Sequence, residues 1–208
     1  MKHILLFLLD GYADWESGFA SAKLNKPDLG YKVHTISLTQ SVTSQGNFST
    51  NIEYSLDTFQ DFQNLAALLL IGGTGWGNQH LIKGYSPTLY DTASSQKITT
   101  FIDRCLTCQN VLVAAICDGA TFLADNRYLD KIAHTGNSLA HLKEKAPAYQ
   151  GECLFQEKQA VASDWIITAN GTAPLEFTRE ILIALNMLGT KEKADAWFTL
   201  YKHGSFES

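Results

Sequence analysis

The sequence predicts an α/β fold with a mainly parallel central sheet. Short apolar runs alternate along the chain with longer stretches of helical pattern, which is the order of parallel strands joined by helices. A chain of 208 residues, of which 45% are hydrophobic, is long enough to bury one sizeable core. No internal repeat, low-complexity segment or linker divides it. We therefore expect residues 1–208 to form a single domain.

Each expected element has a local reason. The strands are apolar runs closed by turn residues: 3–9, 31–38, 66–71, 111–115, 160–162 and 165–169. The expected helices are 14–24, 88–107, 119–124, 138–145, 174–188 and 191–201. Asp14 is placed to cap the first helix, and Pro87 stands near the start of the second. Residues 42–54 are rich in Ser, Thr and Asn around a Gln-Gly-Asn turn, so they predict a short hairpin at the sheet edge. Ser163 and Asp164 predict a second hairpin turn.

Composition and charge exclude several classes of function. The net charge is −5 and no basic cluster occurs, so we expect no binding to nucleic acid or to anionic membranes. The apolar run 4–9 is too short for a spanning helix or a signal-peptide core, which favours a cytoplasmic protein. The four cysteines do not suggest a disulfide framework. Cys105 and Cys108 lie in a helical stretch with no second Cys or His pair nearby, so a core-facing helix is favoured over a zinc or redox site. We expect neither a metal nor a cofactor.

The strongest chemical pattern is the stretch 111–124, VLVAAICDGATFLA. An apolar strand is followed by a sharp turn and a helix, and Cys117 lies in the turn between the small residues Ala115 and Gly119. This is the cysteine version of a nucleophile elbow, in which a strained strand-to-helix turn places one side chain above the sheet. The backbone N–H groups and the dipole at the helix N-terminus favour a thiolate there. The alternative is a small buried cysteine at a strand end.

Two further segments leave strands at the edge where sites form in open α/β sheets. Segment 72–77 has four glycines but matches neither a Walker nor a dinucleotide pattern. We interpret it as a loop whose backbone N–H approaches a reacting oxygen, and a tight turn with positive φ is compatible with that role.

In segment 10–16, Glu16 is either a helix-start charge or a functional carboxylate. His134 and His141 follow the elbow, and either is a surface histidine or a base for the cysteine.

Four blocks, found in the same order along the chain, resemble the DJ-1/PfpI superfamily. They are Gly11-x-x-x-x-Glu16, Leu70-Ile71-Gly72-Gly73, Ala115-Ile116-Cys117 and IITANGTAPLE at 166–176. The resemblance implies a flavodoxin-like three-layer sandwich, related to class I glutamine amidotransferase domains. It also implies a homodimer, because members of the superfamily are usually dimers or larger.

The resemblance assigns roles to particular positions of this chain. Cys117 matches the reactive cysteine of the family, and Glu16 matches the acidic residue that hydrogen-bonds its sulfur. The backbone N–H groups of Gly73 and Asp118 match the donors of the oxyanion hole. His134 is the candidate for the histidine that some members contribute from the segment after the elbow helix.

The chain departs from the family pattern at two of these places. The protease-like branch has His directly after the cysteine, whereas this chain has Asp118, whose charge raises the pKa of a neighbouring thiol. The closest alignment places Thr135, and not His134, at the position of the later histidine. The stretch 134–152 is similar to the bacterial amidotransferase-like branch.

These observations lead to three hypotheses. The first is a cysteine-dependent hydrolase or amidase that acts on a small amide or a reactive carbonyl substrate through Cys117, with His134 or a water held by Glu16 moving protons. The second is a redox-responsive or chaperone-like protein in which Cys117 is oxidised. The third is a binding scaffold without catalysis, which the replacement of the usual histidine by Asp118 suggests.

Overall fold

The computed structural model describes residues 1–77, 92–107 and 111–204. Within these residues the main sheet has seven strands in the order β5-β2-β1-β6-β7-β9-β8. They are β1 (Lys2–Phe7), β2 (Tyr31–Ser37), β5 (Tyr54–Ser55), β6 (Leu65–Leu70), β7 (Leu112–Ile116), β8 (Ala160–Ser163) and β9 (Ile166–Ala169). Neighbouring strands pair in parallel, except that β8 runs antiparallel to β9. The predicted α/β class with a mainly parallel sheet is confirmed.

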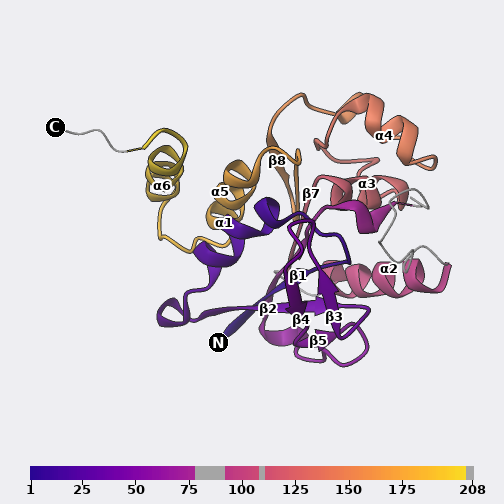
Figure 1. Ribbon diagram of the computed structural model, residues 1–208. Coiled ribbons are helices and arrows are strands. Elements are labelled where there is room, and N and C mark those ends of the chain that lie inside the picture. Colours follow the sequence, from indigo (N-terminus) through magenta and orange to yellow (C-terminus); the bar gives the residue numbers. More distant parts are fainter. Residues whose placement is uncertain (78–91, 108–110, 205–208) are drawn as a thin grey trace.

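Helices cover both faces of this sheet (Figure 1). On one face lie α1 (Asp14–Leu24), α5 (Pro174–Ala184) and α6 (Lys191–His203), and on the other lie α2 (Thr92–Thr107), α3 (Asp118–Asp125) and α4 (Leu139–Lys145). Side chains that alternate along each strand divide the core into two parts. In β1, Leu5 and Phe7 pack on the α2 and α3 side, whereas Ile4 and Leu6 pack on the α1 and α5 side. The fold is therefore the expected flavodoxin-like three-layer sandwich.

The predicted hairpin in 42–54 forms, but it does not extend the main sheet. Its strands, β3 (Ser41–Thr43) and β4 (Ser49–Asn51), pair antiparallel in a small sheet of their own, and β5 takes the edge of the main sheet. Two carboxylates, one in the loop after β1 and one at the first residue of α1, hold the hairpin in place. The Asp10 carboxylate accepts the Thr43 N–H at 2.7 Å, and the Asp14 carboxylate accepts the Gly46 N–H at 2.7 Å.

Several expected helix ends need correction. Asp14 is not the cap of α1, because Ala13 occupies the N-cap position and the Asp14 carboxylate is bound to the hairpin instead. Helix α5 ends at Ala184 and not at residue 188, since the chain turns at Asn186 with a left-handed φ of 49°. Helix α2 is described from Thr92 onward, so Pro87 and the expected start of that helix lie outside the described residues.

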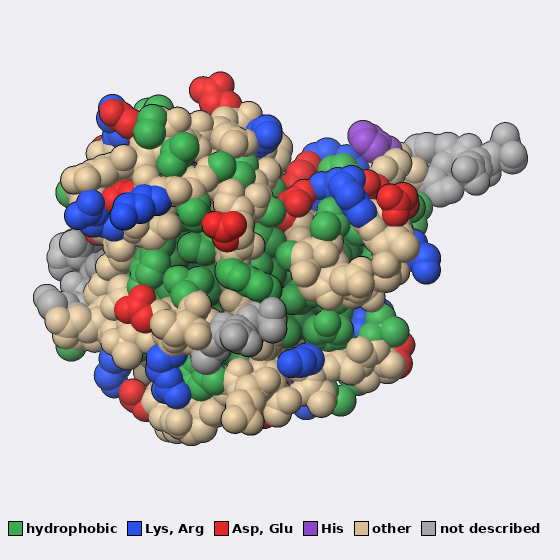
Figure 2. All heavy atoms as spheres, turned by 180° about the vertical axis from the view of Figure 1, so that it is seen from behind, with side chains coloured by type: hydrophobic (Ala, Val, Ile, Leu, Met, Phe, Trp, Pro, Cys, Tyr) green, Lys and Arg blue, Asp and Glu red, His purple; other side chains and the backbone are tan. Residues whose placement is uncertain are grey.

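Several large apolar side chains are exposed at the surface. From behind, hydrophobic side chains gather in the middle of the face, between the body of the molecule and the part that carries α6 (Figure 2). None of the helices in the described ranges has both the length and the apolar composition required to cross a lipid bilayer.

Candidate active site

The three polar or glycine-rich segments at the carboxyl ends of β1, β6 and β7 meet at one place. The Ala13 N–H donates to the Gly72 carbonyl at 3.0 Å, which joins the loop after β1 to the loop after β6. Gly72 in turn lies directly against the elbow. A Cβ atom added to Gly72 would lie 2.4 Å from Cys117 Cβ and 2.5 Å from Glu16 Oε2. The fold thus brings Cys117 and Glu16 together, although they are distant in the sequence.

Cys117 occupies a strained turn between β7 and α3. Its φ of 58° and ψ of −126° lie in a region that residues with a side chain rarely adopt, so the surrounding structure must hold it there. The Cys117 N–H is bound to the Ala169 carbonyl at 3.0 Å. Gly119 is required for a steric reason, because a Cβ at that position would lie 2.5 Å from the Leu70 carbonyl oxygen. The chain therefore passes from β7 through a strained turn at Cys117 directly into α3.

The Glu16 carboxyl group is completely buried beside Cys117. Neither of its oxygens has a hydrogen-bond partner of ordinary geometry. Burial raises the pKa of Glu16 from its ordinary 4.5 to about 7, while the nearby Cys117 thiol and the Gly72 backbone act in the opposite direction. Near neutral pH this carboxyl group is therefore able both to hold and to release a proton.

The Cys117 thiol is itself difficult to ionise. Burial is the largest cause, followed by the negative charges of Glu16 and Asp118, and together they raise the pKa of the thiol to about 12. The effect expected of Asp118 from the sequence is thus found. The helix N-terminus, which favours the thiolate, is outweighed by burial and by the two carboxylates. When Glu16 holds a proton, the carboxylate charge beside the sulfur disappears, and with it the second of these causes.

Asn137 makes the direct side-chain hydrogen bond to the sulfur. Its Nδ2 donates to Cys117 Sγ at 3.3 Å, and its Oδ1 accepts the Gly171 N–H at 3.0 Å, which fixes the orientation of the amide. The bond to the sulfur lowers the pKa of the Cys117 thiol and so partly opposes burial. Sequence reasoning missed Asn137. The available signal was its place in the irregular stretch after the elbow helix, near the expected histidine.

Gly171 is a second glycine that lies close to the sulfur. A Cβ at this position would lie 2.9 Å from Cys117 Sγ and 3.0 Å from Glu16 Oε1. Its carbonyl accepts the indole N–H of Trp15 at 3.0 Å. Gly171 belongs to the block at 166–176, but its contact with the sulfur was not predicted.

The proposed oxyanion donors lie on the two loops that flank the sulfur. Gly73 adopts a φ of 134°, which an L side chain rarely allows, and Asp118 is the first residue of α3. Among the described residues, the N–H groups of Gly73 and Asp118 donate in no loop or cap hydrogen bond. The role of these two N–H groups as oxyanion donors stays a prediction.

His134 has hydrogen-bond partners away from the sulfur. It is completely buried, its Nδ1 lies 2.8 Å from the Ile132 carbonyl oxygen and its Nε2 lies 2.6 Å from the Tyr149 hydroxyl. Burial is the main cause that lowers the pKa of His134. The neighbouring Thr135 donates its hydroxyl to the Lys158 carbonyl. Neither residue is hydrogen-bonded to Cys117, and a role for His134 as its base stays a prediction.

His141 is the histidine that the fold connects to the elbow. Its Nε2 lies 2.8 Å from Asp118 Oδ1, and the same oxygen accepts the Thr121 hydroxyl at 3.2 Å. Helix α4 positions the ring, because the Ser138 side chain caps that helix by accepting the His141 N–H at 3.0 Å.

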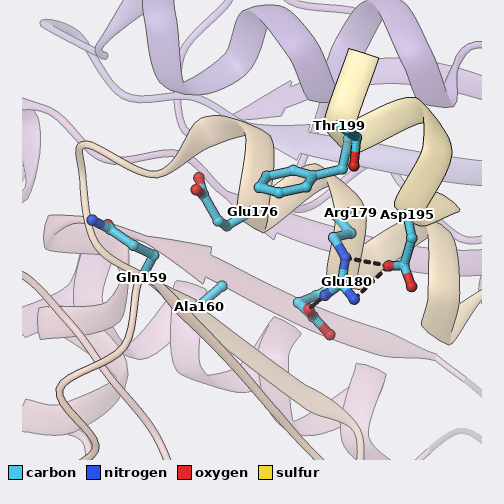
Figure 3. Close-up of a pocket in the computed structure, with 8 residues that line it drawn as sticks. Gln159, Ala160, Glu176, Arg179, Glu180, Asp195 and Thr199 are labelled. Carbon is cyan, nitrogen blue, oxygen red and sulfur yellow. Dashed lines mark hydrogen bonds and ion pairs between the residues drawn. The ribbon is translucent and has the colours of Figure 1, made fainter. Parts of the chain in front are cut away.

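In the described part of the chain, no three His, Cys, Asp or Glu side chains are grouped so that they could hold a metal ion. Cys105 is buried in α2, and Cys108 lies outside the described residues. A pocket of about 440 Å³ lies between β8, α5 and α6, where Arg179 binds Asp195 at 2.6 Å (Figure 3). The described residues that line this pocket include neither cysteine nor histidine.

Comparisons with known proteins agree with the family resemblance found in the sequence. A family model described as "DJ-1/PfpI family" matches residues 2–184. The protein of Bacillus subtilis (strain 168) named "Uncharacterized protease YdeA" is 34% identical over 206 residues, which is 99% of this chain and 94% of that protein. The structure of a thiJ/pfpI family protein from Bacillus anthracis matches with a TM-score of 0.83 and 30% identity, over 98% of this chain and 92% of the other. The DJ-1 superfamily protein Atu0886 from Agrobacterium tumefaciens matches with a TM-score of 0.77 and 31% identity, over 98% of this chain and 100% of the other.

Proposed function

Because the chain belongs to the DJ-1/PfpI family, we propose that it is a cysteine-dependent hydrolase or amidase that acts on a small amide or a reactive carbonyl substrate. The observation that carries this proposal is the placement of Cys117 in a strained elbow against the buried, unpartnered carboxyl group of Glu16. The name "protease" given to the relative from Bacillus subtilis supports hydrolysis as the class of reaction.

In the first half of the reaction, Glu16 acts as the base for the nucleophile. The Cys117 S–H proton moves to the Glu16 carboxylate, and the sulfur attacks the carbonyl carbon so that a C–S bond forms. The negative oxygen of the tetrahedral intermediate accepts the N–H groups of Gly73 and Asp118. The C–N bond of an amide then breaks, and the leaving amine takes the proton from Glu16. A pKa of about 7 suits Glu16 to both transfers near neutral pH.

The walls of the site favour a small substrate. Gly72 and Gly171 lie so close to Cys117 that an added Cβ would come within 2.4 Å and 2.9 Å of its side-chain atoms. The sulfur is therefore confined between two backbone segments, and a small acyl group reaches it more readily than a folded chain.

The pH profile of alkylation tests the proposed base. Iodoacetamide labelling followed by mass spectrometry measures Cys117 and the exposed Cys153 in the same sample. We expect the Cys117 rate to rise through about pH 7, where the Glu16 carboxyl group ionises and is able to accept the thiol proton. The Glu16→Gln variant should lose that rise. The proposal fails if the Cys117 rate shows no rise near pH 7 that Cys153 lacks, or if the Cys117 profile is unchanged in the variant.

Oxidation is a second candidate function, and the surroundings of the sulfur favour it. The Asn137 amide donates to the sulfur, and a protonated Glu16 would add a second donor to a sulfinate. Peroxide titration with intact-mass measurement separates the two candidates. Addition of two oxygens at Cys117, without turnover on a panel of small amides, would favour sensing. Retained ligand binding and absence of both reactions would instead indicate a scaffold.

We also propose that the chain forms a homodimer. Trp15 and Phe48 are 51% and 66% exposed, and they lie close in sequence to Asp14 and Gly46, which a hydrogen bond joins. Large exposed apolar side chains of this kind favour burial against a partner. Sedimentation should give a dimer for the natural chain and a monomer for a Trp15→Ser, Phe48→Ser variant. The matched control is Leu29→Ser, because Leu29 is 50% exposed elsewhere. A monomeric natural chain would refute the proposal.

A further inference from the structure

We propose that His141, oriented by Asp118, is the base that activates water in the second half of the reaction. This inference rests on the function proposed for Cys117, since it concerns hydrolysis of the acyl group that Cys117 would carry. The inference assigns a catalytic role to the side chain of Asp118, which follows Cys117 at the position where the protease-like branch has a histidine.

The contact between Asp118 and His141 fixes the tautomer of the imidazole. An ionised carboxylate only accepts hydrogen bonds, so the 2.8 Å contact with Asp118 Oδ1 requires a hydrogen atom on His141 Nε2. In a neutral ring, the lone pair then resides on Nδ1. No hydrogen bond to Nδ1 is found among the described residues, so this nitrogen is free to accept a proton from water.

The positions of the two groups suit a water-facing base. The His141 and Asp118 side chains are 28% and 30% exposed, so water reaches them, whereas Glu16 and His134 are completely buried. Asp118 directly follows Cys117 in the chain, so its contact with His141 brings the imidazole close to the turn that carries the sulfur. We therefore assign the proton transfer at the buried carboxyl group to Glu16 and the proton transfer from water to His141.

Asp118 also stabilises the charge that this step creates. Water attacks the thioester carbon, a C–O bond forms and one water proton passes to His141 Nδ1. The resulting imidazolium lies against the Asp118 carboxylate, as in other carboxylate–imidazole pairs that act as bases. The C–S bond then breaks, and the departing thiolate takes the proton from His141. The carboxylic acid is released, and Cys117 and His141 return to their starting protonation states.

The competing interpretation is that this contact only joins α3 to α4. A partly exposed ion pair contributes at most about 1 kcal/mol to stability. Such a pair would affect unfolding slightly and would leave the individual steps of turnover unaffected. The two interpretations therefore differ in kinetics and not in the static structure.

Burst kinetics with 4-nitrophenyl acetate separates them. This small activated ester should give a rapid release of one nitrophenolate per Cys117, followed by a slower steady rate, with the signal of a Cys117→Ala variant subtracted. We expect His141→Gln to keep the burst and to lower the steady rate by about 100-fold, in the range of a lost general base. Intact mass should then show acetylated Cys117 accumulating. The matched control is His203→Gln, since His203 is an exposed histidine at the end of α6.

Two further measurements exclude a structural explanation. Added imidazole should restore deacetylation in a His141→Ala variant that unfolds at the same temperature as the natural chain. Asp118→Asn should slow the steady rate in the same direction, because it removes the orienting carboxylate. An unchanged steady rate in His141→Gln, or a loss of its burst, would overturn the assignment while leaving Cys117 as the nucleophile. Absence of any burst in the natural chain would refute the function of Cys117 and this inference with it.

Discussion

The buried carboxyl group of Glu16 makes the stability of the fold depend on pH in a definite direction. Its pKa is raised by burial from 4.5 in an exposed carboxyl group to about 7 in the folded chain. Between these values the folded state binds more protons than the unfolded state, so stability falls as the pH rises from about 4.5 to about 7. Above that range the carboxyl group is ionised in both states, and its contribution no longer changes.

The size of this effect follows from the same shift. At about 1.4 kcal/mol per pKa unit, the ionised Glu16 makes the folded state about 3 kcal/mol less stable above pH 7 than below pH 4.5. The Glu16→Gln variant keeps the shape of the side chain but cannot ionise. We therefore expect this variant to gain about 3 kcal/mol relative to the natural chain between pH 4 and pH 8.

Urea unfolding of both proteins at several pH values measures the difference. The matched control is Glu157→Gln, because Glu157 is exposed and should show no such gain. A Cys117→Ala background should keep the effect, since burial and not the thiol is its largest cause. Parallel stability curves for the natural chain and Glu16→Gln would refute the reasoning, because they would mean that the folded state does not raise the pKa of this carboxyl group.

Two other substitutions test the walls of the site. In Gly171→Ala, the new Cβ would lie 2.9 Å from Cys117 Sγ, so we expect the alkylation rate of Cys117 to fall at least about 10-fold and stability to fall by about 1–3 kcal/mol. Gly18→Ala is the control: nothing lies within 4 Å of the new Cβ, and α1 should gain about 0.5–1 kcal/mol. In Asn137→Ala, the sulfur loses a hydrogen bond that lowers its pKa, so the pH profile of Cys117 alkylation should move upward. Faster alkylation of Gly171→Ala, or an unmoved profile in Asn137→Ala, would contradict the geometry.

The expectations that rested on local pattern agree best with the structure. The strand-to-helix turn around Cys117 is visible in the sequence because an apolar run, a small residue and a glycine must follow one another for such a turn to form. The alternation of apolar runs and helical stretches likewise predicts the parallel sheet, which the structure contains. The predicted cap of α1 was wrong because it used local sequence alone. Asp14 has a side chain suited to capping, but a hairpin distant in the sequence binds its carboxylate.

The amino-acid sequence by itself determined the α/β order of elements, the elbow and its glycines, because these depend on side chains that are near one another along the chain. Only the tertiary structure decided what surrounds the sulfur. The irregular path after α3 brings Asn137 to Cys117 and helix α4 brings His141 to Asp118, and neither pairing has a fixed spacing in sequence. Burial is the largest cause that raises the pKa values of Glu16 and Cys117, and burial depends on segments that meet only in the folded chain. These two pKa values therefore follow from the tertiary structure and not from any sequence motif.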